Sequence, residues 1–461
     1  MQKSAGYYLR NGSFYSSPAI VRPRVPCQNT RIRIQRRLRY VRSPSQQLRW
    51  ASTASGSPPK TALFFPGISN ESCNHVLQEH FSNDLLGQGV QRIGMATPWI
   101  DAFPRTCKPF LEHLDETLGV DLSSIIASGP HSAITATENA QPAIFAVSIM
   151  ILRVLEQEFG FKTGERINVC LGHSLGEFAA LVTSKHLDYN DALRMLRRRA
   201  EVVSKCSKEA VKEEGSEYGM VALVCEPDRL SSLIEAIHDF LGHGASEGGR
   251  DDSTYDPPAI EQVRIANINA KNQIVLSGSI ERISALLVQL RQFGGHDPRA
   301  VRLATDSPFH SPIMAPAAET VRDILEKTII DFPGRFPCVS NVSARPFTSA
   351  NQIRELLSRQ CVDTVRWWDS VRWLDQEEAV RRWVGIGPGK VGRNLVGKEV
   401  GMRGADMVRG GGVWGISAPK EIEAVLHDLV STYPITSNVH ADDEISLRKL
   451  LRALVEVTSD G

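Results

Sequence analysis

Short apolar runs alternate with longer amphipathic runs along most of the chain, and this alternation predicts an α/β fold. The first apolar run, residues 62–65, stops at Pro66-Gly67, as expected of a strand that ends on a turn. A second buried strand is predicted at residues 167–171. Helical periodicity marks residues 141–156, 177–183 and 190–206. Strands that alternate with helices in this way are typical of a parallel sheet covered by helices.

The pattern changes between residues 219 and 300, where short elements follow a different order. Strands are predicted at 220–224, 263–266 and 274–277, and helices at 228–240 and 280–293. This βαββα order predicts a small inserted α+β subdomain of the ferredoxin-like type over residues 206–300. The Gly-, Ser- and Asp-rich residues 242–258 are expected to form a surface loop within it. The large α/β domain would then comprise residues 61–205 and 301–420, with a C-terminal tail at 421–461.

Positive charge is concentrated at the start of the chain. Residues 1–50 contain one Lys, ten Arg and no acidic residue, whereas the other residues hold 42 Lys and Arg against 52 Asp and Glu. An Arg- and Ser-rich start without acids is typical of a mitochondrial transit peptide, and predicts import into the mitochondrial matrix with cleavage near Trp50 or Ala51. The alternative is a basic arm that binds nucleic acid. Because no aromatic or motif framework for nucleic acid follows it, we expect no nucleic-acid partner.

The cysteine pattern and the hydropathy argue against two further classes of protein. The eight cysteines are scattered without a C-x-x-C pair, which argues against a zinc site or a disulfide framework. No apolar run approaches the roughly 20 residues that a helix needs to cross a bilayer. The most apolar stretch, residues 143–155, is interrupted by Arg153. We therefore expect neither a bound metal nor a membrane span.

The strongest chemical signal is a G-x-S-x-G pattern at Gly172, Ser174 and Gly176, between a predicted buried strand and a predicted helix. In this setting the pattern predicts a nucleophile elbow and an α/β-hydrolase-like large domain. The glycines are needed because the sharp turn brings the backbone close to neighbouring elements. The serine stands at the start of a helix, beside main-chain N–H groups that can stabilise an oxyanion.

The segment Gly172-His173-Ser174-Leu175-Gly176-Glu177 resembles the active-site motif of malonyl-CoA:acyl carrier protein transacylases and polyketide acyltransferase domains. Further matches follow in order over roughly residues 61–420, and they comprise Arg199, Phe309-His310, Ser340-Asn341-Val342, Gln360 and Gly387-Pro388-Gly389. Two positions depart from the family pattern: Ala200 stands where Gly is usual, and Thr364 where Pro is common. An ordered set of motifs makes the resemblance specific.

The resemblance implies a transferase that works by a ping-pong mechanism without a cofactor. Ser174 would attack the thioester of malonyl-CoA, with His310 as the base, and acyl carrier protein would then take the malonyl group from the serine ester. In this family a main-chain carbonyl near the Gln360 position orients the histidine, so no third acidic residue is expected. Phe309 is similar to the residue of malonyl-selective members. The resemblance also implies a monomer.

Arg199 is expected to select malonyl groups, because the resemblance places it as the family's carboxylate-binding arginine, 25 residues after Ser174. A guanidinium paired with the free malonyl carboxylate would contribute about 1.5–3 kcal/mol, which an acetyl group would forgo. The alternative is that Arg199 belongs to a solvated basic helix face together with Arg194, Arg197 and Arg198.

The N-terminal motif of the family, Phe-Pro-Gly-Gln-Gly, is interrupted in this chain. Gly67 ends the first half, and Gln88 continues the second half after residues 68–87. We hypothesise that these 20 residues derive from a retained intron, the alternative being a genuine surface insertion. The segment bears on the chemistry because Gln88 resembles the residue whose N–H forms the oxyanion hole together with that of Leu175. Loss of one such donor costs about 2.7–4 kcal/mol.

Two other classes of protein remain as alternatives. A serine esterase or thioesterase of the α/β-hydrolase type shares G-x-S-x-G, but it would be expected to place an acid between the serine and the histidine in the sequence. The motifs around Arg199 and His310 argue against it. The second alternative is an acyl carrier protein binder that the insertion at 68–87 has inactivated. The presence of Ser174, Arg199 and His310 argues against this class as well.

Overall fold

The computed structural model describes residues 59–67, 90–241, 261–305, 307–402 and 411–431 of the 461-residue chain. Several predicted features lie outside these ranges. They are the transit peptide at 1–50, the segment at 68–87, Gln88, the loop at 242–258 and most of the tail at 421–461.

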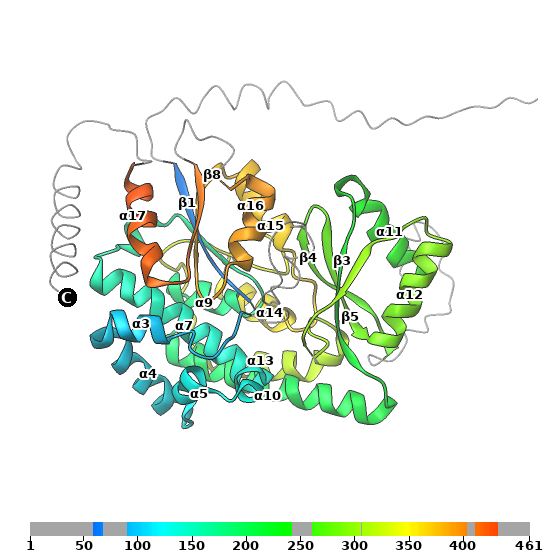
Figure 1. Cartoon of the computed structure of the whole chain (residues 1–461), viewed down its shortest axis with the longest axis horizontal. Helices are drawn as coiled ribbons and strands as arrows, with labels where there is room; N and C mark the ends of the chain where they lie inside the picture. The colour runs from blue at the N-terminus through cyan, green and yellow to red at the C-terminus, as the bar shows by residue number, and fades with distance from the viewer. Residues whose placement is uncertain (1–58, 68–89, 242–260, 306, 403–410, 432–461) are drawn as a thin grey trace, which may run out of the picture. The chain divides into compact units, whose positions relative to one another are not determined.

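The larger of the two described sheets is parallel throughout and has the strand order β7-β2-β1-β8-β9 (Figure 1). Its strands are β1 Lys60–Phe65, β2 Val169–Gly172, β7 Cys338–Val339, β8 Val380–Ile386 and β9 Gly412–Ile416. The central strand β1 is almost fully buried, because helices cover both faces of a parallel sheet. The structure therefore confirms the predicted α/β fold with a parallel sheet.

Helices surround this sheet. They are α3 Thr97–Ala102, α4 Pro104–Leu118, α5 Leu122–Ser128, α6 His131–Thr135, α7 Thr137–Glu158, α8 Thr163–Arg166, α9 Gly176–Thr183, α10 Tyr189–Glu214, α13 Ala315–Lys327, α14 Ala350–Arg359, α15 Trp367–Gln376, α16 Val391–Val400 and α17 Ile422–Ser431. The helix predicted at 177–183 matches α9 to within one residue, whereas α7 and α10 extend beyond the helices predicted at 141–156 and 190–206.

Helix α7 lies in the core of the protein. By length and apolar composition it could cross a membrane, but 83% of its most apolar 18-residue window is buried within the fold. Its buried side chains include Ile144, Phe145 and Met150, none of which is exposed to solvent. Burial of this kind is typical of a helix in a protein core.

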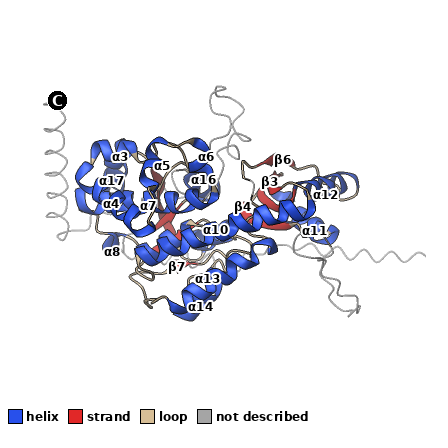
Figure 2. Ribbon diagram, turned by 90° about the horizontal axis from the view of Figure 1, so that it is seen from below, coloured by secondary structure: helices blue, strands red, loops and turns tan. Residues whose placement is uncertain are grey.

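Helix α10 extends beyond the predicted end at residue 206 and continues to Glu214. The added turns carry mostly charged residues, which is why the sequence pattern ends early, yet Ala210 is buried in line with Val203 and Cys206. The helix stops at Gly215, which takes the left-handed conformation with φ 68° that favours glycine at a helix C-terminus. Seen from below, α10 leads from the helices of the parallel sheet toward the second sheet (Figure 2).

The second sheet is antiparallel and has the order β4-β5-β3-β6. Its strands are β3 Tyr218–Val224, β4 Arg264–Ala270, β5 Gln273–Ser279 and β6 Arg299–Arg302, and its helices are α11 Leu230–Phe240 and α12 Ile280–Gln292. The two helices and the sheet share a hydrophobic core of their own, which includes Leu223, Leu233 and Ile274. The sequence did not predict strand β6, because its short, largely exposed sequence shows no clear alternation. The strand also extends past residue 300, the predicted end of the subdomain.

Backbone hydrogen bonds join the antiparallel sheet to the rest of the fold. The N–H of Val365, just before α15, donates to the carbonyl of Ala266 at 2.8 Å, and the N–H of Ile268 donates to the carbonyl of Val365 at 3.0 Å. This pairing holds the middle of β4 next to the segment that leads into α15. Side chains of β4 consequently reach the carboxyl end of β2, where the G-x-S-x-G turn lies.

Candidate active site

Ser174 lies on a sharp turn between β2 and α9, with a φ of 51° that non-glycine residues rarely adopt. A Cβ atom on Gly172 would lie 1.9 Å from the carbonyl oxygen of Gly176, and one on Gly176 would lie 2.6 Å from the carbonyl oxygen of Phe65. Neither position could therefore hold a larger residue without moving the backbone. This is the strand–turn–helix geometry of a nucleophile elbow.

The structure brings Ser174 and His310 together, although they are far apart in the sequence. The Oγ of Ser174 lies 2.8 Å from Nε2 of His310, and Nδ1 of His310 lies 2.7 Å from the main-chain carbonyl oxygen of Gln360. Because a carbonyl can only accept, Nδ1 carries the proton and Nε2 is free to accept the serine hydroxyl. The ring partner is thus the carbonyl that the family resemblance implied, whereas a hydrolase triad would require a carboxylate there.

The environment of His310 keeps its imidazole neutral. The side chain is buried, and burial together with the positive charge of Arg199 lowers its pKa to about 3. At neutral pH the ring is therefore unprotonated and able to take a proton. A protonated histidine could not act as the base toward Ser174.

Arg199 is buried beside these two residues and is held by neutral groups. Its guanidinium nitrogens donate to Oε1 of Gln141, to Oε1 of Gln360 at 3.3 Å and to Sγ of Cys361 at 3.4 Å. The ring of Phe178 lies 5.9 Å below the guanidinium. Within the described ranges Arg199 makes no ion pair with a carboxylate. A buried cation without a paired anion is suited to bind a negatively charged ligand.

A small cavity connects the predicted site residues. It is lined by His173, Ser174, Leu175, Arg199, Met220, Asn267, Phe309 and His310. Among the described residues, nothing accepts a hydrogen bond from the main-chain N–H of Leu175, so this donor is available next to the serine hydroxyl. Gln360 lies behind the cavity wall, where it contacts both His310 and Arg199. Gln88 lies outside the described residues.

Asn341 has a structural role that the sequence analysis did not assign. It follows the short strand β7, next to β2 in the sheet, and its Oδ1 accepts a hydrogen bond from the N–H of Ser174 at 2.7 Å. Its Nδ2 donates to the carbonyl of Gly172 at 2.6 Å. The available signal was its position: polar residues that follow neighbouring parallel strands meet at the same edge of the sheet.

His173 joins the turn to the antiparallel sheet. Its Nε2 lies 2.9 Å from Oδ1 of Asn269 and 3.2 Å from Nδ2 of Asn267, both on β4. Its ring meets that of Trp367 edge to face at 5.4 Å. Burial lowers its pKa, so the ring is neutral. His173 thus both packs against Trp367 and lines the cavity.

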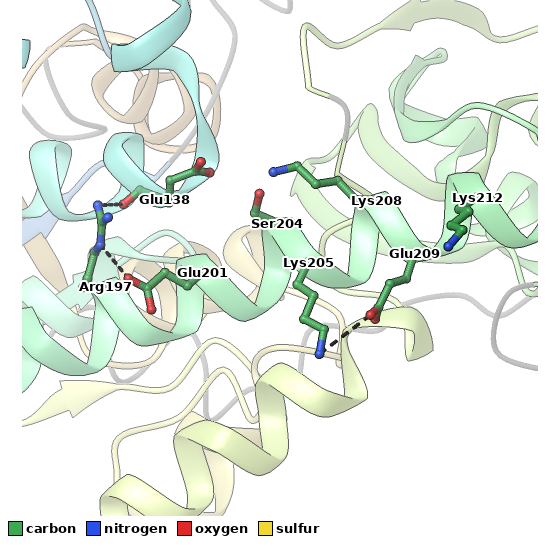
Figure 3. A pocket seen from close by; sticks show the side chains of 8 residues that line it. All are labelled: Glu138, Arg197, Glu201, Ser204, Lys205, Lys208, Glu209 and Lys212. Carbon is green, nitrogen blue, oxygen red and sulfur yellow. Dashed lines mark hydrogen bonds and ion pairs between the residues drawn. The ribbon is translucent and has the colours of Figure 1, made fainter.

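A wider hollow lies along the exposed side of α10 and is separate from this cavity (Figure 3). Arg197 there donates to the carbonyl of Glu138 and to the carboxylate of Glu201, and Lys205 pairs with Glu209. These residues of α10 lie on its exposed side, whereas Arg199 lies on its buried face. The four neighbouring arginines therefore divide: Arg199 belongs to the cavity, whereas Arg194, Arg197 and Arg198 form surface ion pairs.

Neither a metal cluster nor a disulfide is found in the part of the chain that the structure describes. No group of three or more His, Cys, Asp and Glu side chains is placed there to hold a metal ion, and the six described cysteines are free. Burial raises the pKa of Cys170 and Cys338, which lie on adjacent strands below the serine, so both remain thiols.

Comparison with known proteins gives concordant results. The acyl transferase domain family matches residues 85–230. The chain is 33% identical over 343 residues to the malonyl CoA-acyl carrier protein transacylase of Bacillus subtilis strain 168, covering 74% of this chain and 95% of the relative. It is 31% identical over 318 residues to the protein of the same name from Haemophilus influenzae, covering 68% and 90%.

Solved structures show the same relationship. The acyl-carrier-protein-S-malonyltransferase of Bartonella henselae superposes with a TM-score of 0.61 at 30% identity, over 80% of this chain and 99% of that one. A malonyl-transacylase solved in complex with its type II PKS acyl-carrier protein matches with a TM-score of 0.60 at 26% identity, over 81% and 99%. The similarity therefore extends over nearly the whole length of these proteins.

Proposed function

This chain belongs to the malonyl CoA-acyl carrier protein transacylase family, and we propose on that basis that it moves a malonyl group from coenzyme A to acyl carrier protein through an ester on Ser174. The observation that carries the proposal is the arrangement of one cavity. The hydroxyl of Ser174 faces Nε2 of His310 at 2.8 Å, and the buried, unpaired cation of Arg199 lines the same space.

In the first half-reaction Ser174 Oγ attacks the thioester carbonyl of malonyl-CoA while its proton passes to Nε2 of His310. The developing oxyanion accepts a hydrogen bond from the N–H of Leu175. When the C–S bond breaks, His310 returns the proton to the departing CoA sulfur. The malonyl group is then an ester of Ser174, and the imidazole is neutral again.

In the second half-reaction the same groups act in the reverse order. The thiol of the phosphopantetheine arm of acyl carrier protein gives its proton to His310 and attacks the malonyl ester. The C–O bond to Ser174 breaks, and the serine oxygen regains its proton from His310. A neutral base suits both steps, because it takes up and releases one proton in each half-reaction. No step requires a cofactor.

Arg199 supplies the preference for malonyl groups in this proposal. Its guanidinium is fixed by Gln141, Gln360 and Cys361, and it is available to pair with the free carboxylate of the malonyl group. Phe309, the residue before His310, lines the same cavity. An acyl group without a carboxylate would leave the arginine buried and unpaired.

We propose Gln88 as the second oxyanion donor, and residues 68–87 as an addition to the family's chain. Two observations support this. The acyl transferase family match begins at residue 85, just before Gln88. Residues on either side of the undescribed segment lie near one turn: a Cβ on Gly387 would lie 2.6 Å from Pro66, and a Cβ on Gly389 would lie 3.5 Å from Val90. A chain without residues 68–87 would therefore have a short gap to bridge.

We further infer that the parallel sheet belongs to the α/β-hydrolase-like type and that the antiparallel sheet forms an inserted ferredoxin-like subdomain. The nucleophile elbow after β2 supports the first inference. The second is supported by the βαββαβ order of β3, α11, β4, β5, α12 and β6. We also propose that the protein is a monomer, which light scattering of the purified protein can test.

We propose that the protein acts in the mitochondrial matrix, in mitochondrial fatty acid synthesis. The support is the acid-free, Arg-rich composition of residues 1–50. A fusion of residues 1–60 to a fluorescent protein should enter mitochondria, and the mature protein should begin near Ala51. A fusion that stays in the cytosol would contradict this location without affecting the proposed reaction.

The reaction is tested by intact-mass measurement after brief exposure of the protein to malonyl-CoA. We expect a malonyl adduct that maps to Ser174, that is absent from Ser174→Ala, and that acyl carrier protein removes. Hydrolysis of the adduct without transfer would instead support a thioesterase. Parallel measurements with and without residues 68–87 test the insertion: labelling of the shortened chain alone would indicate a retained intron.

A further inference from the structure

Glu177 is a buried carboxyl group that the proposed mechanism does not use. It lies in the first turn of α9, where every other side chain in the helix is uncharged, and it is not exposed to solvent. It does not line the cavity that holds Ser174 and His310. A buried carboxyl costs free energy unless hydrogen bonds compensate for its lost hydration. The hydrogen-bond partners of Glu177 should therefore explain why a carboxyl group stands in an otherwise apolar helix.

Both carboxyl oxygens of Glu177 accept hydrogen bonds from residues of the active site. Oε2 accepts from Nε2 of Gln360 at 2.6 Å, and Oε1 accepts from the main-chain N–H of Asn341 at 3.1 Å. The Ser340 side chain also hydrogen-bonds to this carboxyl group. These donors come from two segments, one after β7 and one after α14.

The two main partners of Glu177 also contact the reacting pair: Gln360 contacts both residues, and Asn341 contacts Ser174. Gln360 donates from Nε2 to the carbonyl of Ser174 at 2.7 Å, and its own carbonyl accepts from Nδ1 of His310. Asn341 accepts from the N–H of Ser174 through Oδ1. Glu177 thus lies one hydrogen bond away from the residues that fix the backbone of the serine and the ring of the histidine.

We propose that Glu177 is a positioning residue for the Ser174–His310 pair, an inference that rests on the proposed acyl transfer. A carboxylate can accept from both donors at once, whereas an amide of the same shape offers one acceptor and one donor group. The Gln360 amide then has one stable orientation, with Nε2 toward Glu177 and the Ser174 carbonyl, and Oε1 toward Arg199. Loss of the carboxylate would release this orientation and let the His310 carbonyl partner shift.

Burial and the neighbouring groups act on the ionisation of Glu177 in opposite directions. Burial raises its pKa to about 8, while the hydrogen bonds from Gln360 and Asn341 and the positive charge of Arg199 act in the opposite direction. With a pKa of about 8 the group is only partly ionised at neutral pH, and the hydrogen bonds from Gln360 and Asn341 favour the ionised form, which is the form that accepts from both partners. Gln360 and Asn341 gain a strong acceptor, because hydrogen bonds to a charged group are about twice as strong as those between neutral groups.

The test compares Glu177→Gln and Glu177→Asp with the wild type in single-turnover malonylation of Ser174. Misplacement of a reacting group by 1 Å can cost about 100-fold in rate, so we expect E177Q to acylate about 100-fold more slowly. The apparent Kd for malonyl-CoA should change little, since the cavity lining is intact. E177D keeps the charge and should recover a large part of the rate, and this rescue would not occur if only the side-chain volume mattered.

Thr183→Val provides a matched control on the same helix. Thr183 is buried and donates only to the carbonyl of Ala179, so its loss removes a polar group from α9 without touching the site. T183V should acylate at the wild-type rate. The proposal is overturned if E177Q acylates as fast as T183V, or if its rate falls only in proportion to a weaker Kd. If E177Q does not fold, E177D decides: its shorter side chain reaches both partners less well, so it should acylate more slowly than T183V at an unchanged Kd, and a rate equal to that of T183V overturns the proposal.

The same experiment separates this inference from the proposed function. If the wild-type protein forms no malonyl ester on Ser174, the proposed function fails, whatever the variants do. If the wild type is malonylated and E177Q is malonylated equally fast, the proposed function stands and the positioning role is wrong.

Discussion

The parallel and antiparallel sheets contribute to one cavity in different ways. The parallel sheet delivers residues from the carboxyl ends of its strands: Ser174 after β2 and Asn341 after β7. The antiparallel sheet presents side chains from within its strands, namely Asn267 on β4 and Met220 on β3. The first sheet therefore supplies reacting groups, and the second supplies a wall.

The two sheets also differ in how their residues are held. Ser174 is fixed through its main-chain N–H and carbonyl, and the ring of His310 through the main-chain carbonyl of Gln360. Contacts from β4 to the elbow run between side chains, from Asn269 and Asn267 to His173. Each contact of the first kind has a main-chain group at one end, which cannot adjust by a change of rotamer, whereas both ends of the contacts from β4 are side chains that can. Substitutions should thus cost more activity on the side of the parallel sheet.

The largest effect is expected for His310→Ala. Loss of a general base typically costs about 100- to 10,000-fold, so single-turnover malonylation of Ser174 should slow by that factor while the apparent Kd for malonyl-CoA stays nearly unchanged. His113→Ala is the control, since His113 contacts Asn190 outside the cavity. A loss of only a few-fold in H310A would show that another group accepts the serine proton.

Arg199→Gln should have the next largest effect, and only for malonyl-CoA. Removal of a charge-assisted pair worth about 1.5–3 kcal/mol lowers kcat/KM about 10- to 150-fold. The rate with acetyl-CoA should not fall by a comparable factor. Arg198→Gln is a matched control, because this neighbour is exposed and pairs only with Glu201. Equal losses for both thioesters would mean that Arg199 supports the fold of the cavity and does not select the substrate.

The fold was largely predictable where the sequence carries a strong pattern. Apolar runs predicted β1 and β2 to within a few residues, and the βαββα order predicted the second sheet. Strand β6 was missed because three of its four residues are exposed or charged, and it is defined only by its pairing with β3, from Val221↔Arg302 onward. Such an edge strand depends on tertiary context, which a local pattern does not contain.

The site was predictable to a lesser degree. Ser174 follows from its motif between a strand and a helix, but the residues alone could not select His310 among twelve histidines. That choice rested on family resemblance, because the partner of the histidine ring is a main-chain carbonyl without a side-chain signature. Glu177 did have a signal, as the one charged residue of its apolar helix, yet its meaning depended on partners about 160 to 180 positions away.

A smaller effect is expected on the pH dependence of acylation in Arg199→Gln, which tests how the charge of Arg199 acts on His310. The charge of Arg199 lowers the pKa of His310, after burial as the larger cause, so R199Q should raise that pKa from about 3 toward its usual value. Activity is lost as the pH falls through this pKa, because the protonated ring cannot accept a proton. Acylation by acetyl-CoA should therefore decline at a higher pH in R199Q than in the wild type. An unchanged acid limb would contradict electrostatic coupling between the two residues.

The smallest effect is expected for Asn269→Ala, on the antiparallel side. The variant loses one side-chain hydrogen bond to His173, worth about 0.5–1.5 kcal/mol, and Asn267 remains to hold the ring. Malonylation should slow by less than about 10-fold. The ratio of the rates with malonyl-CoA and acetyl-CoA should stay unchanged. Asn272→Ala, in the turn between β4 and β5, controls for changes to this hairpin. A loss in N269A as large as that in H310A would break the comparison, because the antiparallel sheet would then help to position the reacting groups and would be more than a wall.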